Sequence, residues 1–311
     1  MINADFLNVI SKELKFGRVE LIEKDVILNQ LLIELSNDKQ FSKHFAFKGG
    51  TCLIKCYLGY LRFSEDLDFT WVRQELFNGK TANEVKKEIS GLLDWVIELF
   101  HKVATKIHIR FIADKKNTRY VQYGGNEKLV TLKLYYDSVI LQSESFIKIQ
   151  LNFTELLLYP IKMRKLPFRP IPLNDPDLEM LFPAEYNNYF KTINILTYDL
   201  REISCEKMRA ILTRAGIKVR DYLDLYYIAK FQKVDLLSLR PFVIQKLRYA
   251  IKQFSKYQDN LVLKKKLLSS EGLFRWSEEK SMLLRKLDEN EFGSFVKDIE
   301  DLLKSVIANL E

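Results

Sequence analysis

The sequence predicts an α+β protein, with a mixed sheet and its helices in the N-terminal half and a helical C-terminal half. Before residue 154, several segments alternate apolar and polar residues with the period of strands, whereas the period after Leu200 is almost entirely helical. The chain has 311 residues, of which 47% are hydrophobic and 29% charged. This is enough for one large or two modest globular domains with a substantial buried core.

The N-terminal elements follow from these two periods. Apolar residues at helical spacing indicate helices at 23–36 and 83–100, and a short helix is expected at 51–57. Apolar or alternating segments predict strands, which we place at 45–48, 66–69, 107–111, 128–136 and 146–153. We therefore assign residues 1–160 to the sheet domain.

Prolines separate the two halves of the chain. A stretch rich in proline cannot continue a helix or a central strand, so residues 161–199 are expected to form a connector. Residues 200–311 then form the helical domain, with helices near 200–214, 219–230, 241–258, 277–287 and 291–309. The prolines of the connector are Pro167, Pro170, Pro172, Pro176 and Pro183.

A double-glycine turn and a pair of alternate aspartates carry the chemistry. Gly49 and Gly50 follow an apolar strand, and Asp66 and Asp68 lie on the next one. Side chains on a strand alternate, so both carboxylates point the same way while Leu67 faces the core. Two parallel carboxylates can hold a divalent ion such as Mg²⁺ or Mn²⁺.

The residues around the turn predict a site for a metal-bound nucleoside triphosphate. Glycines let backbone amides approach a phosphate, and the following helix adds its positive N-terminal end. Thr51 contributes a hydroxyl, and Lys48 either neutralises a phosphate or simply ends the strand.

These motifs resemble the nucleotidyltransferase superfamily, whose signature is a Gly-Gly or Gly-Ser turn followed by Asp-x-Asp or Asp-x-Glu. Within it, the chain resembles the AbiEii/AbiGii toxin family of bacterial and archaeal toxin–antitoxin systems. The resemblance spans roughly residues 20 to 230. It rests on three ordered blocks, Phe47–Leu53, Arg62–Phe69 and Glu206–Leu225, the last containing Arg220-Asp221-Tyr222.

The resemblance implies roles for further residues. Ser64 matches the serine of the family's Arg-x-Ser-x-Asp-x-Asp pattern and would face the triphosphate, whereas Arg62 would contact a phosphate or pair with Glu65. Lys207 matches a lysine that contacts nucleotide phosphates, and Asp221 an aspartate beside the metal or the attacking hydroxyl.

Three positions on the later helices have alternative explanations. Arg214 is either a phosphate contact or a bridge between the halves. For Asp221 and Asp224, the alternative to a role in the site is a helix-surface ion pair between Arg220 and Asp224. The helical domain is nevertheless expected to complete the active site.

One strand departs from the superfamily pattern. At 147–153, many members carry a third carboxylate facing the metals, and this chain has Gln150 there. A neutral amide cannot act as a general base. Either Asp221 supplies the missing charge, or deprotonation is left to the metal or to water. Lys148 shares the face of Gln150, so it can approach a phosphate.

The composition limits location and partners. The formal net charge of +8 fits an anionic partner such as RNA. Three unclustered cysteines and three histidines argue against a disulfide framework and a zinc site. No apolar run approaches the roughly 20 residues that span a bilayer, and the start lacks the features of a secretory signal. We expect a cytoplasmic protein with no membrane association.

The expected function follows from the resemblance. It implies a toxin-like enzyme that transfers a nucleoside monophosphate from an NTP to a hydroxyl acceptor, most readily the 3′ end of tRNA, with release of pyrophosphate. It also implies a cognate antitoxin encoded nearby, with or without direct contact. The alternatives are transfer to a protein, or a non-catalytic nucleotide-binding module.

Overall fold

The structure, a computed structural model, describes residues 2–166, 176–276, 283–284 and 286–310. The chain forms two compact units. Unit 1 comprises Met1–Glu155 and Ile161–Tyr198, and unit 2 comprises Leu156–Pro160 and Asp199–Glu311. The α+β class is confirmed, because one mixed sheet precedes a series of helices.

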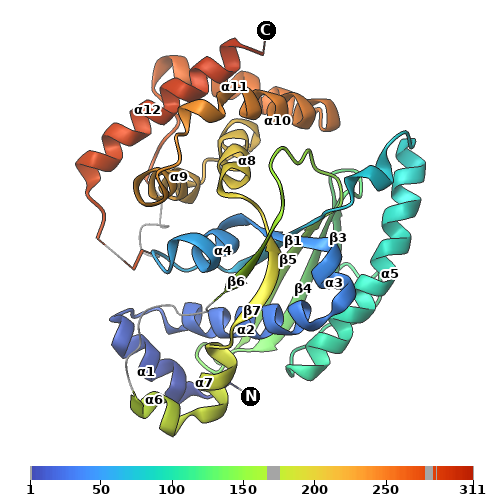
Figure 1. The fold of residues 1–311 in the computed structure, drawn as a ribbon, viewed down its shortest axis with the longest axis vertical. Helices are drawn as coiled ribbons and strands as arrows, with labels where there is room; N and C mark the ends of the chain where they lie inside the picture. The colour runs from blue at the N-terminus through green and yellow to red at the C-terminus, as the bar shows by residue number, and fades with distance from the viewer. Residues whose placement is uncertain (1, 167–175, 277–282, 285, 311) are drawn as a thin grey trace. The chain divides into compact units, whose positions relative to one another are not determined.

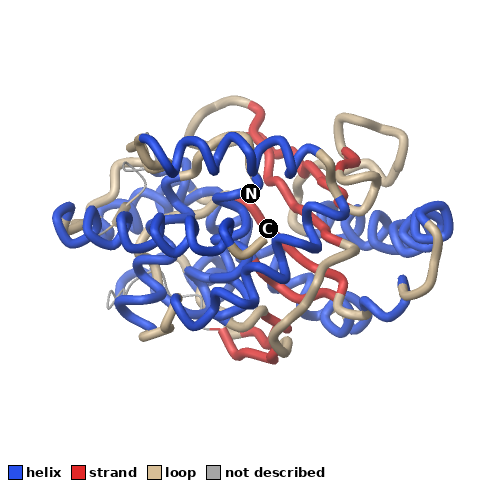
Figure 2. The backbone as a smooth tube through the Cα atoms, turned by 90° about the horizontal axis from the view of Figure 1, so that it is seen from above, coloured by secondary structure: helices blue, strands red, loops and turns tan. Residues whose placement is uncertain are grey.

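Unit 1 is built on a seven-stranded sheet with the order β3-β4-β5-β2-β1-β7-β6 (Figure 1). Figure 2 draws the strands in red. The pairs β2–β5 and β1–β7 are parallel, and the other neighbours are antiparallel. The strands are β1 Phe45–Lys48, β2 Asp66–Trp71, β3 Val121–Gly124, β4 Leu129–Asp137, β5 Glu144–Asn152, β6 Lys162–Leu166 and β7 Ile193–Thr197.

One face of this sheet is apolar and carries the core of unit 1. Phe45 stacks on Phe41 of α3, with ring centroids 4.7 Å apart, and also meets Trp95 of α5 at 6.1 Å. A capping box between Thr81 and Glu84 starts α5. The helices of unit 1 are α1 Ala4–Leu14, α2 Val19–Asn37, α3 Lys39–His44, α4 Gly49–Leu53, α5 Ala82–Lys106, α6 Pro176–Leu181 and α7 Pro183–Tyr189, with a π-helix at Ile54–Leu58 and a 3₁₀ helix at Gln74–Phe77.

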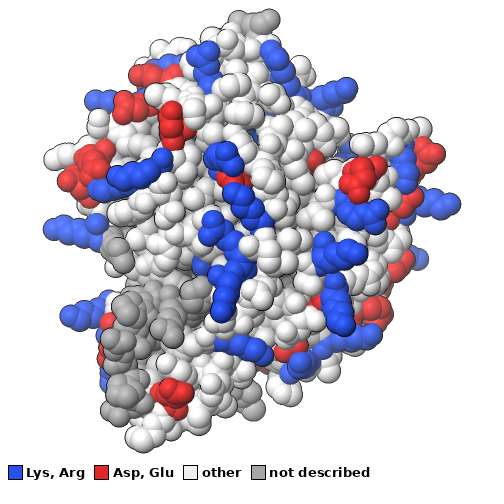
Figure 3. All heavy atoms as spheres, viewed as in Figure 1, with Lys and Arg blue, Asp and Glu red and all other residues white. Residues whose placement is uncertain are grey.

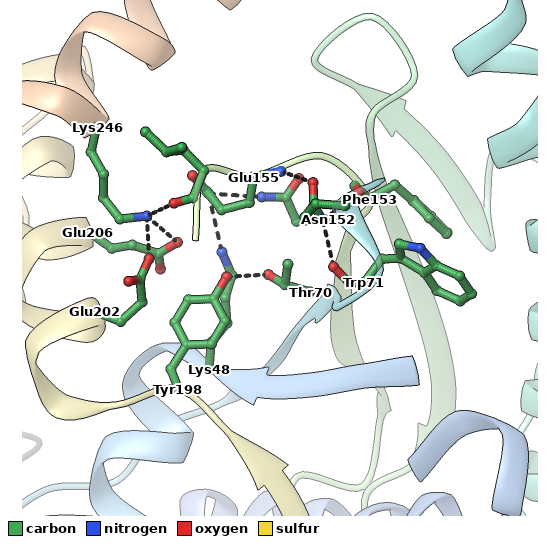
Figure 4. Close-up of polar contacts among 12 residues, drawn as sticks. Lys48, Thr70, Trp71, Asn152, Phe153, Glu155, Tyr198, Glu202, Glu206 and Lys246 are labelled. Atoms are coloured by element: carbon green, nitrogen blue, oxygen red, sulfur yellow. Dashed lines mark hydrogen bonds and ion pairs between the residues drawn. The ribbon is translucent and has the colours of Figure 1, made fainter. Parts of the chain in front are cut away.

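Unit 2 is helical, and a buried ion pair joins its two chain segments. Lys246 and Glu202 are fully buried, with their charged atoms 2.6 Å apart. The Lys246 ammonium also donates to the Leu156 carbonyl at 2.7 Å (Figure 4). Glu202 accepts from two amides in 156–160. The elements of unit 2 are α8 Leu200–Thr213, α9 Val219–Gln232, a 3₁₀ helix at Leu237–Leu239, α10 Arg240–Gln253, α11 Lys256–Ser270 and α12 Glu289–Ala308.

Two expectations differ from the structure. The strand expected at 107–111 is a loop with a single bridge from Arg110 to Tyr135, because α5 continues to Lys106 and His108 has a positive φ of 60°. The helix expected at 241–258 is broken at Phe254, whose backbone is extended. The helix expected near 277–287 falls largely outside the described residues.

The segment expected to be a connector contributes to the sheet. Strands β6 and β7 pair with each other, and β7 also pairs with β1. Pro183 occupies the first turn of α7, where its missing amide hydrogen costs no helical hydrogen bond. The prolines therefore do not prevent regular structure on either side, and Pro167, Pro170 and Pro172 lie outside the described residues.

Within the described ranges, none of the helices combines the length and the apolar character needed to cross a membrane.

Candidate active site

The two aspartates lie on the polar face of the sheet in unit 1. Asp66 and Asp68 are half-buried, whereas Leu67 and Phe69 between and beyond them are fully buried on the opposite face. The expected alternation is thus confirmed. In the parallel register, β5 places Lys148 beside Asp66 and Gln150 beside Asp68.

Gly49 allows the turn to lie directly against Asp68. Its φ is +76°, in the left-handed region, and a Cβ built there would lie 2.2 Å from Asp68 Oδ2. A Cβ on Gly50 would lie 2.7 Å from Arg62 Nη2 and 3.3 Å from Ser64 Oγ. Both glycines therefore leave room for polar side chains that the motif places next to them.

Three of the predicted site residues form a buried polar layer beneath this turn. Thr51 Oγ1 lies 2.8 Å from Ser64 Oγ, and Thr51, Ser64 and Arg62 are all buried. Arg62 donates to the Phe63 carbonyl at 2.8 Å. Arg62 and Ser64 precede the first residue of β2, and their polar atoms close to Gly50 support the turn from below.

Two lysines border the carboxylates. Lys48 ends β1 in register with Asp68, and Lys148 Nζ lies 3.4 Å from Asp66 Oδ2. Lys148 is about one-third exposed at its side chain. Positive charge is therefore available on two sides of the aspartate strand, from β1 and from β5.

Glu155 is a further carboxylate of this region that the sequence did not indicate. It follows β5 in the chain, and its Oε2 lies 3.8 Å from Lys48 Nζ and accepts from Asn152 at 3.1 Å (Figure 4). Its backbone amide donates to Gln74 at 2.8 Å. Glu155 is nearly buried, so Lys48 is held by a carboxylate more than 100 residues away in the chain. The only local signal was an acid directly before the apolar run Leu156-Leu157-Leu158.

A buried network fixes the helical segment that follows the glycine turn. Lys55, on the π-helix, lies 2.6 Å from both Asp25 Oδ1 and Asn29 Oδ1, and Tyr60 and Tyr189 each donate to Asp25 Oδ2 at 2.7 Å. Burial lowers the pKa of Lys55, and the Asp25 carboxylate opposes this shift. Lys55, which is almost inaccessible to water, therefore ties the segment after the turn to α2, and Asp25 connects α2 to α7 through Tyr189.

In unit 2, Lys207, Asp221, Asp224 and Arg214 form one ionic cluster. Lys207 Nζ lies 2.6 Å from Asp224 Oδ2 and 3.2 Å from Asp221 Oδ1, and Arg214 contacts the other oxygen of Asp221. The side chains of Lys207, Asp221 and Asp224 are buried, and that of Arg214 is exposed. The structure thus joins α8 to α9 through the very residues singled out in the third block.

The acidic residues set the kind of ion that could be bound. Across the part of the chain that the structure describes, no group of three or more His, Cys, Asp or Glu side chains could hold a metal. Asp66 and Asp68 are therefore a two-carboxylate set. Such a set suits Mg²⁺, which is commonly bound by one or two carboxylates together with substrate phosphates and water.

Comparison with known proteins identifies the family. Residues 30–305 match the family model described as the AbiEii nucleotidyl transferase toxin of type IV toxin–antitoxin systems. No curated protein matches the chain. The crystal structure of JHP933 from Helicobacter pylori shares 16% identity, covering 99% of this chain and 96% of that one, with a TM-score of 0.44. That of a candidate nucleotidyltransferase from H. pylori shares 17% identity, covering 94% and 98%, also with a TM-score of 0.44. The family match covers most of the sequence, and the chain therefore belongs to the AbiEii family of nucleotidyl transferase toxins.

Proposed function

We propose that the chain transfers a nucleoside monophosphate from an NTP to the 3′-terminal hydroxyl of tRNA and releases pyrophosphate. The observation that carries this proposal is the close approach of the Gly49 turn to Asp68 on a strand face that also presents Asp66. This geometry brings backbone without side chains next to carboxylates, as a metal-bound triphosphate requires.

The proposed roles follow from the positions in unit 1. Asp66 and Asp68 would hold Mg²⁺ or Mn²⁺, which when bound would neutralise phosphate charge and assist deprotonation of the attacking hydroxyl. Gly49 and Gly50 would offer backbone amides to the triphosphate. Lys48 and Lys148 flank the carboxylates and would stabilise the phosphates by charge-assisted hydrogen bonds.

The buried polar layer beneath the glycine turn and the residues of unit 2 would have less direct roles. Thr51, Arg62 and Ser64 would hold the turn and the start of β2 in place. Their contribution to nucleotide binding would then be indirect, through the position of the turn. Lys207 and Arg214 would bind nucleotide phosphates, and Asp221 would supply the negative charge that Gln150 does not. We propose that these residues complete the active site.

Gly49→Ala is expected to reduce both stability and transfer. The left-handed backbone costs alanine about 1–2 kcal/mol, and the new Cβ would also displace the Asp68 carboxylate. The matched control is Gly79→Ala, which has a φ of +72° and nothing within 4 Å of its Cβ. Thermal melting and transfer assays should show similar backbone costs, with loss of activity only for Gly49→Ala. Equal activity in the two variants would contradict the placement of Asp68 at the reacting phosphates.

Lys207→Met is expected to weaken nucleotide binding roughly tenfold or more, because it removes a charge-assisted phosphate contact. It should also lower the melting temperature, since Asp224 would remain buried without this partner. Lys246→Met is the matched control, another buried lysine of unit 2, which is paired with Glu202. Titration with a non-hydrolysable NTP should show weaker binding only for Lys207→Met. If both variants bind equally well, Lys207 is a structural residue.

The acceptor can be identified with labelled nucleotides. The purified chain is incubated with each α-labelled NTP, Mg²⁺, total RNA and a protein extract, and the products are separated on a gel. We expect label in RNA of tRNA size, and none after periodate has destroyed the 3′-terminal diol. Label in protein, or label that survives periodate treatment, would refute the proposed acceptor.

The cellular setting is part of the proposal. Membership in a toxin family supports a cytoplasmic enzyme with a cognate antitoxin, whether or not the two proteins bind each other. The net charge of +8 supports an anionic acceptor. Lysine and arginine side chains predominate over acidic ones on the face drawn in Figure 3.

A further inference from the structure

The polar face of the sheet continues beyond the aspartates onto β5 and β4. In register, Asp66 lies beside Lys148 and Lys148 lies opposite Lys133, while Phe146 lies opposite Tyr135. We call Lys133, Tyr135, Phe146 and Lys148 the β4–β5 face. Strands are about 4.8 Å apart, so Lys133 is about 10 Å from Asp66 across the sheet.

This face carries an exposed aromatic ring and two lysines that lie opposite each other. Phe146 is 41% exposed, although the neighbouring Ile147 is fully buried and fixes the strand. Lys133 and Lys148 are directly opposite each other, and like charges in this arrangement destabilise a sheet. An anionic ligand that also offers flat rings would relieve both costs.

Lys133 and Phe146 lie close enough together to contact the same ligand. Its ammonium lies 5.2 Å from the centre of the Phe146 ring, and no carboxylate within the described residues forms a salt bridge with it. Tyr135 adds a second ring, with its centre 5.7 Å from that of Phe146. Stacking rings beside basic groups are the usual platform for single-stranded nucleic acid.

At the end of the β4–β5 face away from the aspartates, the basic side chains are paired with acidic ones. Arg119 lies over the Tyr135 ring at 4.3 Å, but it also pairs with Glu144 at 2.6 Å. Arg110 pairs with Asp137 and Glu144. The unbalanced positive charge is therefore Lys133, next to Lys148 and on the side toward the aspartates.

We propose that the β4–β5 face binds the single-stranded end of an RNA acceptor, with a base stacked on Phe146 and a phosphate at Lys133. The inference rests on the proposed function in one respect: the RNA bound to this face would lead to Asp66 and Asp68. A protein partner is the less suitable occupant, because one exposed ring and two lysines do not make the extended apolar patch of a protein interface.

Binding of a short labelled single-stranded RNA to the full chain, followed by fluorescence anisotropy over a salt series, tests this directly. Phe146→Ala and Phe146→Leu should each weaken binding roughly tenfold, while Phe146→Tyr restores it. Lys133→Ala should reduce the slope of log K against log salt by about 0.7. Affinity for a non-hydrolysable NTP should stay unchanged in all of these variants.

Two variants on other surfaces of unit 1 serve as controls. Tyr123, 45% exposed, lies on the edge strand β3 in register with the buried Val130, and so on the opposite face of the sheet. Lys102 is an exposed lysine of α5, the helix that packs on that opposite face. Tyr123→Ala and Lys102→Ala should bind RNA like the wild type, and melting curves verify that every variant is folded.

The outcomes separate this inference from the proposed function. If the wild type labels RNA but the Phe146 and Lys133 variants bind RNA normally, the face is not the binding site and the function stands. If RNA binding depends on both residues but no RNA is labelled, the face stands and the acceptor assignment fails. Absence of single-strand binding by the wild type, or equal loss in the two controls, overturns the inference.

Discussion

Asp68→Ala is expected to lower kcat/KM for nucleotide transfer roughly a thousandfold, which corresponds to a loss of about 4 kcal/mol in transition-state stabilisation. Strand β2 carries two carboxylates, Asp66 and Asp68, so losing one removes half of the charge that this strand offers to a divalent ion. Asp66→Ala should have a similar effect. Its loss would also leave Lys148 without the carboxylate oxygen now 3.4 Å away.

The measurement is steady-state transfer over a Mg²⁺ series, with a melting curve for each variant. Asp94→Ala is the matched control, because Asp94 is an exposed aspartate of the same unit that lies on α5. Both active-site variants are expected to stay folded, since Asp66 and Asp68 are half-exposed. Full activity of either variant at saturating Mg²⁺ would remove the metal assignment.

Lys55→Met is expected to destabilise unit 1 by about 3–5 kcal/mol, since it leaves the buried Asp25 carboxylate without its cation. For a unit of this size the melting temperature should fall by roughly 10 °C. The π-helix of Lys55 follows α4 directly, so the glycine turn should lose its fixed position and transfer should fall as well.

Lys106→Met provides the control for this substitution. Lys106 also pairs with an acid on α2, Glu34, but its side chain is 65% exposed, so the change should cost less than about 1 kcal/mol. Adding Asp25→Asn to Lys55→Met should recover part of the stability, because the unpaired buried charge is then gone. A Lys55→Met protein that melts like the wild type would show that the network contributes nothing to stability.

The strand, glycine turn and aspartate strand could be predicted because each is specified locally. The alternation of Asp66, Leu67 and Asp68 fixes which side chains share a face, and the φ of Gly49 is one that glycine adopts without cost. No tertiary information is needed for either inference.

The partners of these residues could not be predicted, because they come from distant parts of the chain. Lys48 meets Glu155, Lys55 meets Asp25, and Asp25 also accepts a hydrogen bond from Tyr189. In sequence Lys55 is one lysine among many. Strands β6 and β7 were missed for another reason, since the prolines around them favoured a connector without strands.

The pairing of Lys207 with Asp221 and Asp224 is likewise a long-range contact between two helices. Spacing placed the two aspartates on one face of α9, but it could not indicate that a lysine of α8 lies between them. Their role toward nucleotide remains a prediction, which the comparison of Lys207→Met with Lys246→Met tests.

Nucleotidyl transfer is tested by following the two ends of the triphosphate separately. The wild type and Asp68→Ala are each given α-labelled or γ-labelled NTP with total RNA and Mg²⁺. We expect the wild type to label RNA from the α position only and to release the γ label as pyrophosphate, and we expect Asp68→Ala to do neither. Label transferred to an acceptor from the γ position, or undiminished α-label transfer by Asp68→Ala, would contradict nucleotidyl transfer at this strand.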